Sequence, residues 1–316
     1  MPAYFQEQDR LTMAPKTKLI FNPIANLGRA WPVAASLRPL VNELGGADWS
    51  GTVYPTHAAE LARQAGEQGY ELVVAMGGDG TVHEVVNGLM QLPRERRPRM
   101  GVVPVGTGND LAHALGVSNR PEEAIRQVLN GVPRPLDVGL LQGESDQKEY
   151  WVNTVGIGFD TIVTIRSRKV PIFQGFAVYF AAVLQTILLN HDPFRIQVTT
   201  DRETWQDESL MLVLCNGMRE GGGFLMAPQA DPRDGLLHLV EVRKISRLQM
   251  LATIPYFLNA THPRLPYVRT AEFQTLEIES NRPLYVHTDG EIIAGLGSDL
   301  RRLSVRVLHG ALETVS

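Results

Sequence analysis

The sequence predicts an α/β first half and a β-rich antiparallel second half that forms a sandwich. In the first half, short apolar runs end in glycine-rich turns and are followed by helical periodicity, which is typical of a sheet with helices on its faces. In the second half, apolar runs alternate with period two or are separated by turn residues. The 316 residues are long enough for two domains. We place these at 16–140 and 141–310, with 1–15 as a loose tail.

The composition is that of an ordinary globular protein, with 44% hydrophobic and 20% charged residues. The net charge of −4 gives no global basic field, so we expect no nucleic-acid partner. Cys215 is the only cysteine, which excludes an intrachain disulfide, and its apolar neighbours predict a buried side chain. The first residues lack the apolar core of a secretion signal, so we expect a cytoplasmic protein.

The first half opens with a strand at 18–21 that ends at Asn22-Pro23. Loop 25–29 follows, in which Arg29 is either a phosphate contact or a solvated side chain. Apolar spacing then predicts a helix at 31–44, and a strand is expected at 49–54. Thr56 is predicted to cap the next helix, with Glu60 near the capping-box position, and a nucleotide contact is the alternative role.

The first half is organised around the turn Gly77-Gly78-Asp79-Gly80-Thr81, between a strand at 73–76 and a helix at 84–90. Its glycines let a ligand approach the backbone, and the following helix offers free N–H groups to an anion. Asp79 would repel a bare phosphate, so it fits best beside a cation or a ribose hydroxyl. The turn lacks the lysine of a phosphate loop and the spacing of a dinucleotide fingerprint. A simple strand-to-helix turn is the alternative.

A third turn, Gly106 to Ala112, follows a strand at 100–105 and contains Thr107 and Asp110. A helix is predicted at 121–129, and Asp137 lies where the chain leaves the first half. Turns that follow successive parallel strands lie at one edge of the sheet, so we expect a shared ligand cleft there.

The second half contains an uncharged stretch at 172–189. At 18 residues it reaches the low end of a membrane-spanning length, but polar residues interrupt it and prolines flank it. We therefore expect a buried or pocket-lining helix in preference to a membrane span. Strands are predicted at 194–198, 209–215, 236–242, 276–278 and 303–307, with a helical insert at 247–259.

Two acidic turns complete the pattern. The segment Asp231 to Leu236 is either an ordinary Asp-Gly turn or an oxygen-ligand site for Mg²⁺ or Ca²⁺. Asp289-Gly290 predicts a hairpin, which places Glu291 at the start of the return strand. From the residues alone, Glu291 is either a solvent-facing side chain or part of a cleft.

Taken in order, these motifs resemble the diacylglycerol kinase catalytic family, in its bacterial soluble lipid kinase branch, which is related to sphingosine and ceramide kinases. The resemblance covers about residues 16–310. The Gly-Gly-Asp-Gly element alone is shared with NAD kinases and phosphofructokinases, so it implies only that kind of nucleotide-binding domain. The resemblance is carried by Asn22-Pro23, Gly77–Thr81, Pro104–Asp110, Asp137–Gly139, Asp231–Leu236 and Asp289–Glu291.

The resemblance implies an ATP-dependent lipid kinase with its active site between the two domains. The γ-phosphate of ATP would pass to a lipid hydroxyl, and diacylglycerol, giving phosphatidic acid, is the acceptor we expect first. Glu291 and Asp79 are the implied catalytic residues, with Glu291 accepting the hydroxyl proton. The implied ATP contacts are Asn22, Arg29, Thr56, Gly77, Gly78, Asp79, Gly80, Thr81, Gly106, Thr107 and Asp110.

Two Mg²⁺ sites are also implied. Asp79, Asp110 and Asp137 would organise the ion that accompanies ATP, and Asp234 would hold a structural ion with the carbonyls of Asp231 and Leu236. The expected partners are the lipid and the inner face of the membrane, contacted peripherally, and a homodimer is left open. A small-molecule kinase similar to NAD kinases, and a non-catalytic lipid-binding protein with this fold, remain alternatives.

Overall fold

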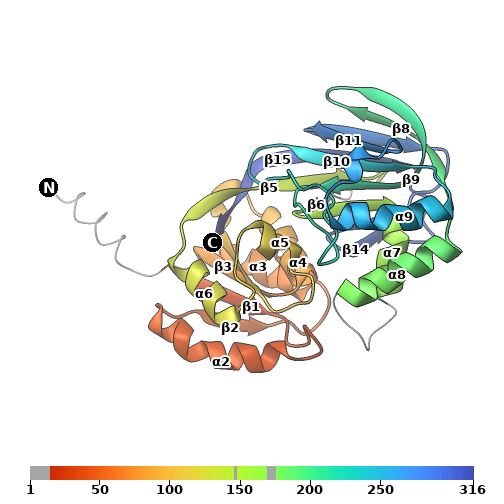
Figure 1. The fold of residues 1–316 in the computed structure, drawn as a ribbon. Coiled ribbons are helices and arrows are strands. Elements are labelled where there is room, and N and C mark those ends of the chain that lie inside the picture. Colours follow the sequence, from red (N-terminus) through yellow and green to blue (C-terminus); the bar gives the residue numbers. More distant parts are fainter. Residues whose placement is uncertain (1–14, 146–147, 169–175) are drawn as a thin grey trace. The chain divides into compact units, whose positions relative to one another are not determined.

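The chain folds into two compact units in this computed structural model, which describes residues 15–145, 148–168 and 176–316 (Figure 1). Unit 1 comprises residues 1–105, 116–134 and 313–316, and unit 2 comprises 106–115 and 135–312. The units therefore interleave along the sequence, whereas the sequence analysis divided the chain once, near residue 140. The predicted tail 1–15 lies outside the described residues except for Pro15.

Unit 1 alternates strands and helices. Its elements are β1 (Thr17–Phe21), α2 (Ala30–Glu43), β2 (Asp48–Gly51), α3 (His57–Glu67), β3 (Leu72–Gly77), α4 (Asp79–Met90), a 3-10 turn (Arg94–Arg96), β4 (Arg99–Pro104) and α6 (Pro121–Asn130). The predicted strand at 49–54 is wrong in its second half, because β2 ends at Gly51. Helix α4 begins five residues before the predicted start, so Asp79 is already its first residue.

The sheet of unit 1 is parallel, with strand order β2-β1-β3-β4 and the last residues of β15 (Arg302–Val315) beside β4. Right-handed crossovers place α2 and α6 on one face and α3 and α4 on the other (Figure 1). All six residues of β3 are buried, as expected for a central strand covered on both faces. The chain reverses direction across the sheet between β1 and β3, which makes their carboxyl ends the topological switch point.

Unit 2 is rich in antiparallel strands. Its elements are α5 (Asp110–Ala114), β5 (Pro133–Gln142, from Pro135 onward), β6 (Lys148–Trp151), β7 (Thr154–Gly158), α7 (Phe159–Ser167), α8 (Phe176–Leu189), β8 (Phe194–Thr200), β9 (Thr204–Cys215), β10 (Leu237–Arg243), α9 (Arg247–Leu258), a 3-10 turn (His262–Arg264), β11 (Val268–Phe273), β12 (Thr275–Ser280), β13 (Val286–Thr288), β14 (Glu291–Ala294) and β15 up to Leu312.

Strand β9 explains how unit 2 is layered. It pairs antiparallel with β7, β8 and β10, and its alternate side chains enter two different cores. Leu212 and Leu214 belong to a core formed mainly by strand residues, whereas Met211, Val213 and Cys215 face a core closed by helices. The run at 209–215 is apolar throughout because both of its faces are buried. The predicted fold class, an α/β domain with a β-sandwich domain, is confirmed.

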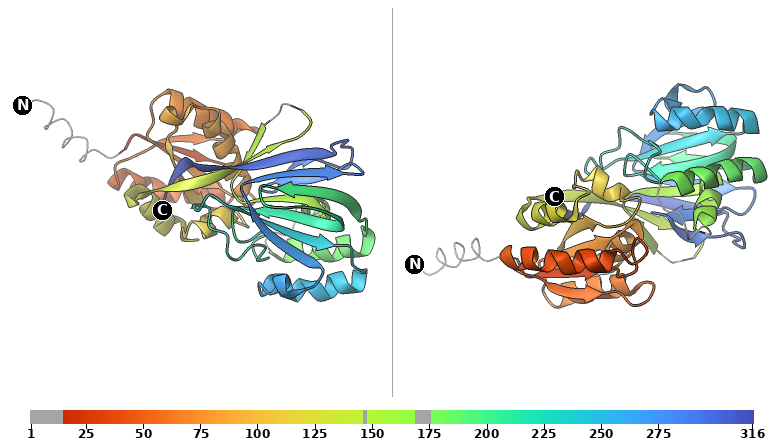
Figure 2. Two further views of the ribbon diagram at one scale, coloured as in Figure 1. Left: turned by 90° about the horizontal axis from the view of Figure 1, so that it is seen from above. Right: turned by 60° about the horizontal axis from the view of Figure 1, so that its bottom comes forward.

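Helices α7, α8 and α9 close the second of these cores. Helix α7 packs on α8, and α8 packs on α9 (Figures 1 and 2). Helix α8 covers the described part of the uncharged stretch, and residues 172–175 of that stretch lie outside the described residues. Its buried residues include Ala182, Val183 and Ile187, so one face of the predicted helix is buried and lines a pocket. Within the described ranges, no helix has the length and apolar character needed to cross a membrane.

Candidate functional site

The turn Gly77–Thr81 joins the carboxyl end of β3 to α4 in unit 1. Gly78 is the residue before the helix, and its carbonyl accepts the N–H groups of Thr81 and Val82. A Cβ on Gly77 would lie 2.3 Å from the Thr81 hydroxyl, so only glycine fits there. The positive end of the α4 dipole lies at this point and favours an anion.

Asn22 lies beside this turn, at the switch point of the sheet. Its N–H donates to the Met76 carbonyl at 3.2 Å, and its side-chain oxygen accepts the N–H of Ile24 at 3.1 Å. The carboxyl ends of β1 and β3 are therefore tied together where ligands bind in open α/β sheets. Arg29, the residue before α2, is exposed, and its nucleotide contact stays a prediction.

The predicted capping role of Thr56 is wrong. Thr56 precedes α3 with a left-handed backbone (φ 71°), and its side chain makes no capping hydrogen bond. The start of α3 is held instead by the Glu84 carboxylate of α4, which accepts the N–H groups of Thr56 and Ala58 at 2.9 and 3.0 Å. Glu60 accepts the Tyr54 hydroxyl, so it makes no capping box. The sequence analysis missed Glu84, because it is 28 residues from Thr56.

In unit 2, the turn Gly106–Asp110 is stabilised by Asn109, whose side-chain oxygen accepts the Gly106 N–H at 3.1 Å. Asp110 begins α5 and is buried, and its carboxylate pairs with Arg219 at 2.8 Å and accepts the N–H of Gly222 at 3.3 Å. Arg219 thus neutralises Asp110 in this structure. No signal in the sequence marked Arg219, which lies more than a hundred residues away.

Asp137 is fully buried and makes contacts with residues of unit 2. Its carboxylate accepts the N–H groups of Gly235 at 2.6 Å and Gly310 at 2.7 Å, and lies 2.8 Å from Nδ1 of His309. These bonds fasten the predicted structural-metal turn to β5 and β15. Its predicted role near ATP stays a prediction.

The turn at 231–236 fits Mg²⁺ in part. A carboxylate and main-chain carbonyls are the oxygen donors that Mg²⁺ takes. Asp234 and Leu236 lie on one turn, where the Asp234 carboxylate accepts the Leu236 N–H at 2.9 Å. The Asp231 carbonyl already accepts the N–H groups of Arg233 and Asp234, so it is the least suitable donor of the three.

Glu291 follows a tight turn between β13 and β14, as the Asp-Gly pair predicted. Asp289 and Gly290 both have positive φ (49° and 85°), which the turn requires. The Asp289 carboxylate accepts three backbone N–H groups, from Val152, Asn153 and Thr154, at 2.8–3.1 Å. The Glu291 side chain is 41% exposed.

Arg168 contacts this turn from the end of α7. It donates to the Gly290 carbonyl at 2.6 Å and pairs with the Glu291 carboxylate at 2.8 Å. Both partners are about half exposed, so the ion pair is solvated and can open.

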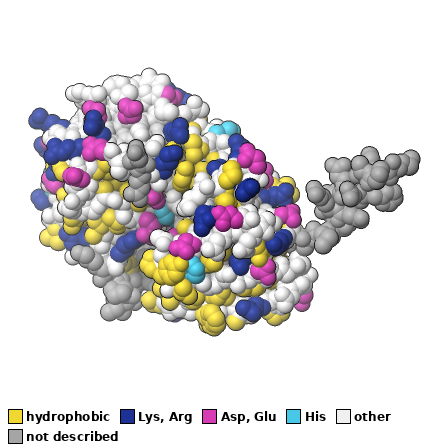
Figure 3. Space-filling view, turned by 180° about the vertical axis from the view of Figure 1, so that it is seen from behind, with side chains coloured by type: hydrophobic (Ala, Val, Ile, Leu, Met, Phe, Trp, Pro, Cys, Tyr) yellow, Lys and Arg dark blue, Asp and Glu magenta, His cyan; other side chains and the backbone are white. Residues whose placement is uncertain are grey.

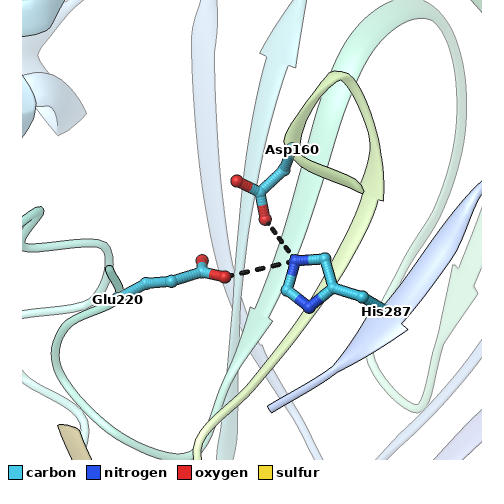
Figure 4. A group of neighbouring side chains, drawn as sticks. All are labelled: Asp160, Glu220 and His287. Carbon is cyan, nitrogen blue, oxygen red and sulfur yellow. Dashed lines mark hydrogen bonds and ion pairs between the residues drawn. The ribbon is translucent and has the colours of Figure 1, made fainter. Parts of the chain in front are cut away.

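Three buried titratable side chains meet beneath the same turn (Figure 4). Nε2 of His287 lies 2.9 Å from Asp160 and 3.2 Å from Glu220, and all three side chains are at least 93% buried. A Cβ on Gly156 would overlap both Asp160 and His287, so this glycine makes room for the cluster. Burial and the neighbouring Asp160 raise the pKa of Glu220 to about 7. The sequence analysis did not find this cluster, because His287 lies 127 residues from Asp160 along the chain.

An apolar pocket lies in unit 2. Tyr179, Val183 and Ile187 of α8 form part of its wall, and Met250, Ile254 and Phe257 of α9 form another part. Among the described residues that line it, Asp160 is the one carboxylate. Such a pocket suits a flexible apolar chain with a polar group at one end.

Comparison with known proteins agrees with this arrangement. Residues 16–141 match the diacylglycerol kinase catalytic domain, and residues 153–315 match the YegS C-terminal NAD kinase beta sandwich-like domain. A protein of Chromohalobacter salexigens named as lipid kinase YegS-like is 35% identical over 73% of each chain. The chain belongs to the diacylglycerol kinase catalytic domain family.

Other members of the lipid kinase family extend the comparison. A diacylglycerol kinase of Bacillus subtilis is 31% identical over 74% of this chain and 75% of its own. The fold is shared with a crystal structure of a diacylglycerol kinase from Bacillus anthracis, with a TM-score of 0.74, 22% identity and coverage of 95% of this chain and 96% of that one. The predicted family and its kinase activity are therefore confirmed.

Proposed function

We propose that this kinase transfers the γ-phosphate of ATP to the hydroxyl group of a lipid, with diacylglycerol as the first candidate and phosphatidic acid as its product. The observation that carries the lipid acceptor is the apolar pocket of unit 2. A water-soluble acceptor such as NAD would gain little from a wall made of α8 and α9 side chains. A lipid chain gains about 25 cal/mol for each Å² of apolar surface that it removes from water.

For ATP, we assign the phosphate contacts to the turn Gly77–Thr81 with Asn22 beside it, and further contacts to Arg29, Thr56, Gly106, Thr107 and Asp110. Phosphoryl transfer depends on positioning and on neutralising spread negative charge more than on covalent chemistry. Backbone N–H groups at the start of α4 supply part of that neutralisation. The carboxylates of Asp79, Asp110 and Asp137 are of the type that holds Mg²⁺. The bound ion would screen the charge of the phosphates.

For the acceptor, we assign Glu291 as the group that takes the hydroxyl proton. A carboxylate beside a hydroxyl serves as a general base when the two come within hydrogen-bond distance. The turn supports this role because Asp289 is held by three backbone N–H groups and keeps the start of β14 in place. The ion pair with Arg168 is solvated, so it can open when the acceptor arrives.

The test is an acceptor screen with purified protein, Mg-ATP labelled at the γ-phosphate, and a panel of diacylglycerol, sphingoid base, ceramide, phosphatidylglycerol, polyprenol and NAD. Transfer to a lipid hydroxyl supports the proposal. Transfer to NAD alone would establish the small-molecule kinase in its place. Lipid binding without transfer to any acceptor would establish the non-catalytic alternative.

We further propose peripheral contact with the inner face of the membrane, since the acceptor resides in a bilayer. Helices α8 and α9 beside the pocket expose Leu188, Leu189 and Leu248, each more than 60% exposed. These exposed leucines make apolar insertion the main attraction we assign. On the opposite face, shown in Figure 3, basic and acidic side chains are interspersed. A homodimer stays a prediction that light scattering after size exclusion would test.

A further inference from the structure

The buried cluster of Asp160, Glu220 and His287 touches the turn that carries Glu291. Nδ1 of His287 accepts the N–H of Gly290, the residue directly before Glu291, at 3.3 Å. Arg168 donates to the carbonyl of the same residue, which belongs to the next peptide group. The backbone at the start of β14 is thus fixed at an N–H group by His287 and at a carbonyl by Arg168.

The other end of the cluster reaches the apolar pocket. The Tyr179 hydroxyl donates to Oδ1 of Asp160 at 2.9 Å, and both residues line the pocket. Oδ2 of Asp160 faces Nε2 of His287 at 2.9 Å. Hydrogen bonds therefore run from the pocket wall through Asp160 and His287 to Gly290. Figure 4 shows the middle link, between Asp160 and His287.

We propose that His287 is a positioning residue for Glu291, with Asp160 and Glu220 orienting its ring so that Nδ1 accepts the Gly290 N–H. The inference rests on the proposed role of Glu291 as proton acceptor. None of the three cluster residues reacts with substrate, and each acts through the backbone of the turn. Their effect is to keep Glu291 at the position where the hydroxyl of a pocket-bound lipid is expected.

The hydrogen bonds fix where the protons lie. An N–H group can donate to Nδ1 only if that nitrogen carries no proton, so the ring proton is on Nε2, facing Asp160 and Glu220. The carboxylates of Asp160 and Glu220 lie against Nε2 and favour one further proton in the cluster, while burial opposes a charge on the ring. A second ring proton would sit on Nδ1 and break the Gly290 bond, so we place it on the carboxylate pair, where the pKa of Glu220 is raised to about 7.

A metal ion is the competing use of the same side chains. One imidazole and two carboxylates form a donor set that divalent transition metals accept, and the ligand atoms lie within 4.8 Å of one another. A metal on Nε2, however, would leave the ring proton on Nδ1, directed at the Gly290 N–H. His287 keeps the hydrogen bond from the Gly290 N–H in the positioning role, whereas as a metal ligand it would lose that bond.

Two substitutions at one position separate the two ends of the ring. In His287→Asn, the amide oxygen lies near the place of Nδ1 and can accept the Gly290 N–H. In His287→Gln, the amide nitrogen reaches toward the carboxylates, as Nε2 does, and leaves the Gly290 N–H without its acceptor. With the lipid acceptor from the screen, we expect His287→Gln to lose kcat by about 10- to 100-fold at unchanged KM for ATP. We expect His287→Asn to retain most of the wild-type kcat. Equal losses of kcat in the two variants, at equal melting temperatures, would overturn the proposal.

Hydrogen exchange tests the placement without any activity measurement. The Gly290 amide should exchange faster in His287→Gln than in the wild type and in His287→Asn, and identical exchange in all three would overturn the proposal. Glu291→Gln separates this result from the proposed function: if that variant stays active, Glu291 is not the base, while the exchange data still report on His287. Elemental analysis of the purified protein tests the metal alternative. A stoichiometric metal that is lost in Asp160→Asn would show that the cluster is a metal site and would overturn the positioning role.

Discussion

Glu291 is the single residue on which the proposed chemistry depends most. Glu291→Gln keeps the size of the side chain and removes its ability to take a proton, so we expect kcat to fall by about 10²- to 10⁴-fold. ATP affinity should be unchanged, because the variant leaves Gly77–Thr81 intact. Initial rates with the lipid acceptor and nucleotide titration measure the two effects. Glu279→Gln, on the exposed side of β12, is the matched control and should keep wild-type rates; near-normal turnover of Glu291→Gln would refute the assignment.

Glu220 makes stability depend on pH. Its pKa is raised to about 7 by burial and by Asp160, so the folded protein binds a proton that the unfolded chain releases above about pH 4.5. The free energy of unfolding should therefore fall as pH rises from about 4.5 to 7, by on the order of 3 kcal/mol. Asp160 and His287 are the groups that face Glu220. Cys215 and Tyr179 lie close by, and burial together with the Asp160 and Glu220 carboxylates raises the pKa of both.

Glu220→Gln is the control for this pH effect, because glutamine imitates the protonated acid. Melting temperatures of the two proteins should converge near pH 5 and separate by pH 7.5, with the wild type lower. Parallel curves across that range would mean that Glu220 does not hold the proton.

Gly156 is required by packing, since an added Cβ would lie 2.1 Å from the Asp160 carboxylate and 2.2 Å from the His287 ring. Both neighbours are held by hydrogen bonds, so relief of this overlap disturbs the cluster. We expect Gly156→Ala to lower the free energy of unfolding by about 1–3 kcal/mol. Gly297→Ala has open space around its Cβ and should change stability by no more than about 0.5 kcal/mol. Chemical denaturation measures both, and equal stabilities would contradict the packing argument.

Among the elements, α8 has two faces with different roles. Tyr179, Val183 and Ile187 line the pocket, while Leu188 and Leu189 are 63% and 62% exposed. We expect Leu188→Ser with Leu189→Ser to weaken sedimentation with anionic liposomes by about tenfold, because apolar insertion is lost. Transfer to a detergent-dispersed acceptor should persist. Val132→Ser, at an equally exposed residue of unit 1, is the control, and equal losses in both proteins would place the membrane contact elsewhere.

The elements could be predicted from the sequence where one signal dominates. The apolar run at 73–76 and the Asp-Gly hairpin at 289–290 lie where expected. Thr56 was misread because a threonine before a helical pattern normally accepts a backbone N–H, whereas here Glu84 of α4 takes that role. The side chain that replaces the local cap comes from another helix, and local sequence cannot reveal it.

At the scale of the whole molecule, local sequence was again sufficient for the predicted site and insufficient for the buried cluster. Motifs with local backbone requirements, such as glycine turns, were found from residue spacing. Asp160, Glu220 and His287 are brought together by α7, the loop after β9 and β13, and His287 lies 127 residues from Asp160. Their contact is a product of tertiary structure. Isolated carboxylates and histidines are too common in any sequence to predict it.

The interleaving of the two units has a consequence for biosynthesis. In unit 1, β4 is bordered by β3 on one side and by Thr314 and Val315 on the other. On the ribosome, β4 emerges about two hundred residues before those partners. During that interval the nascent chain carries an open sheet edge, which is a template for pairing with other chains. We infer that pairing with other chains competes with the assembly of unit 1 until β15 has been synthesised.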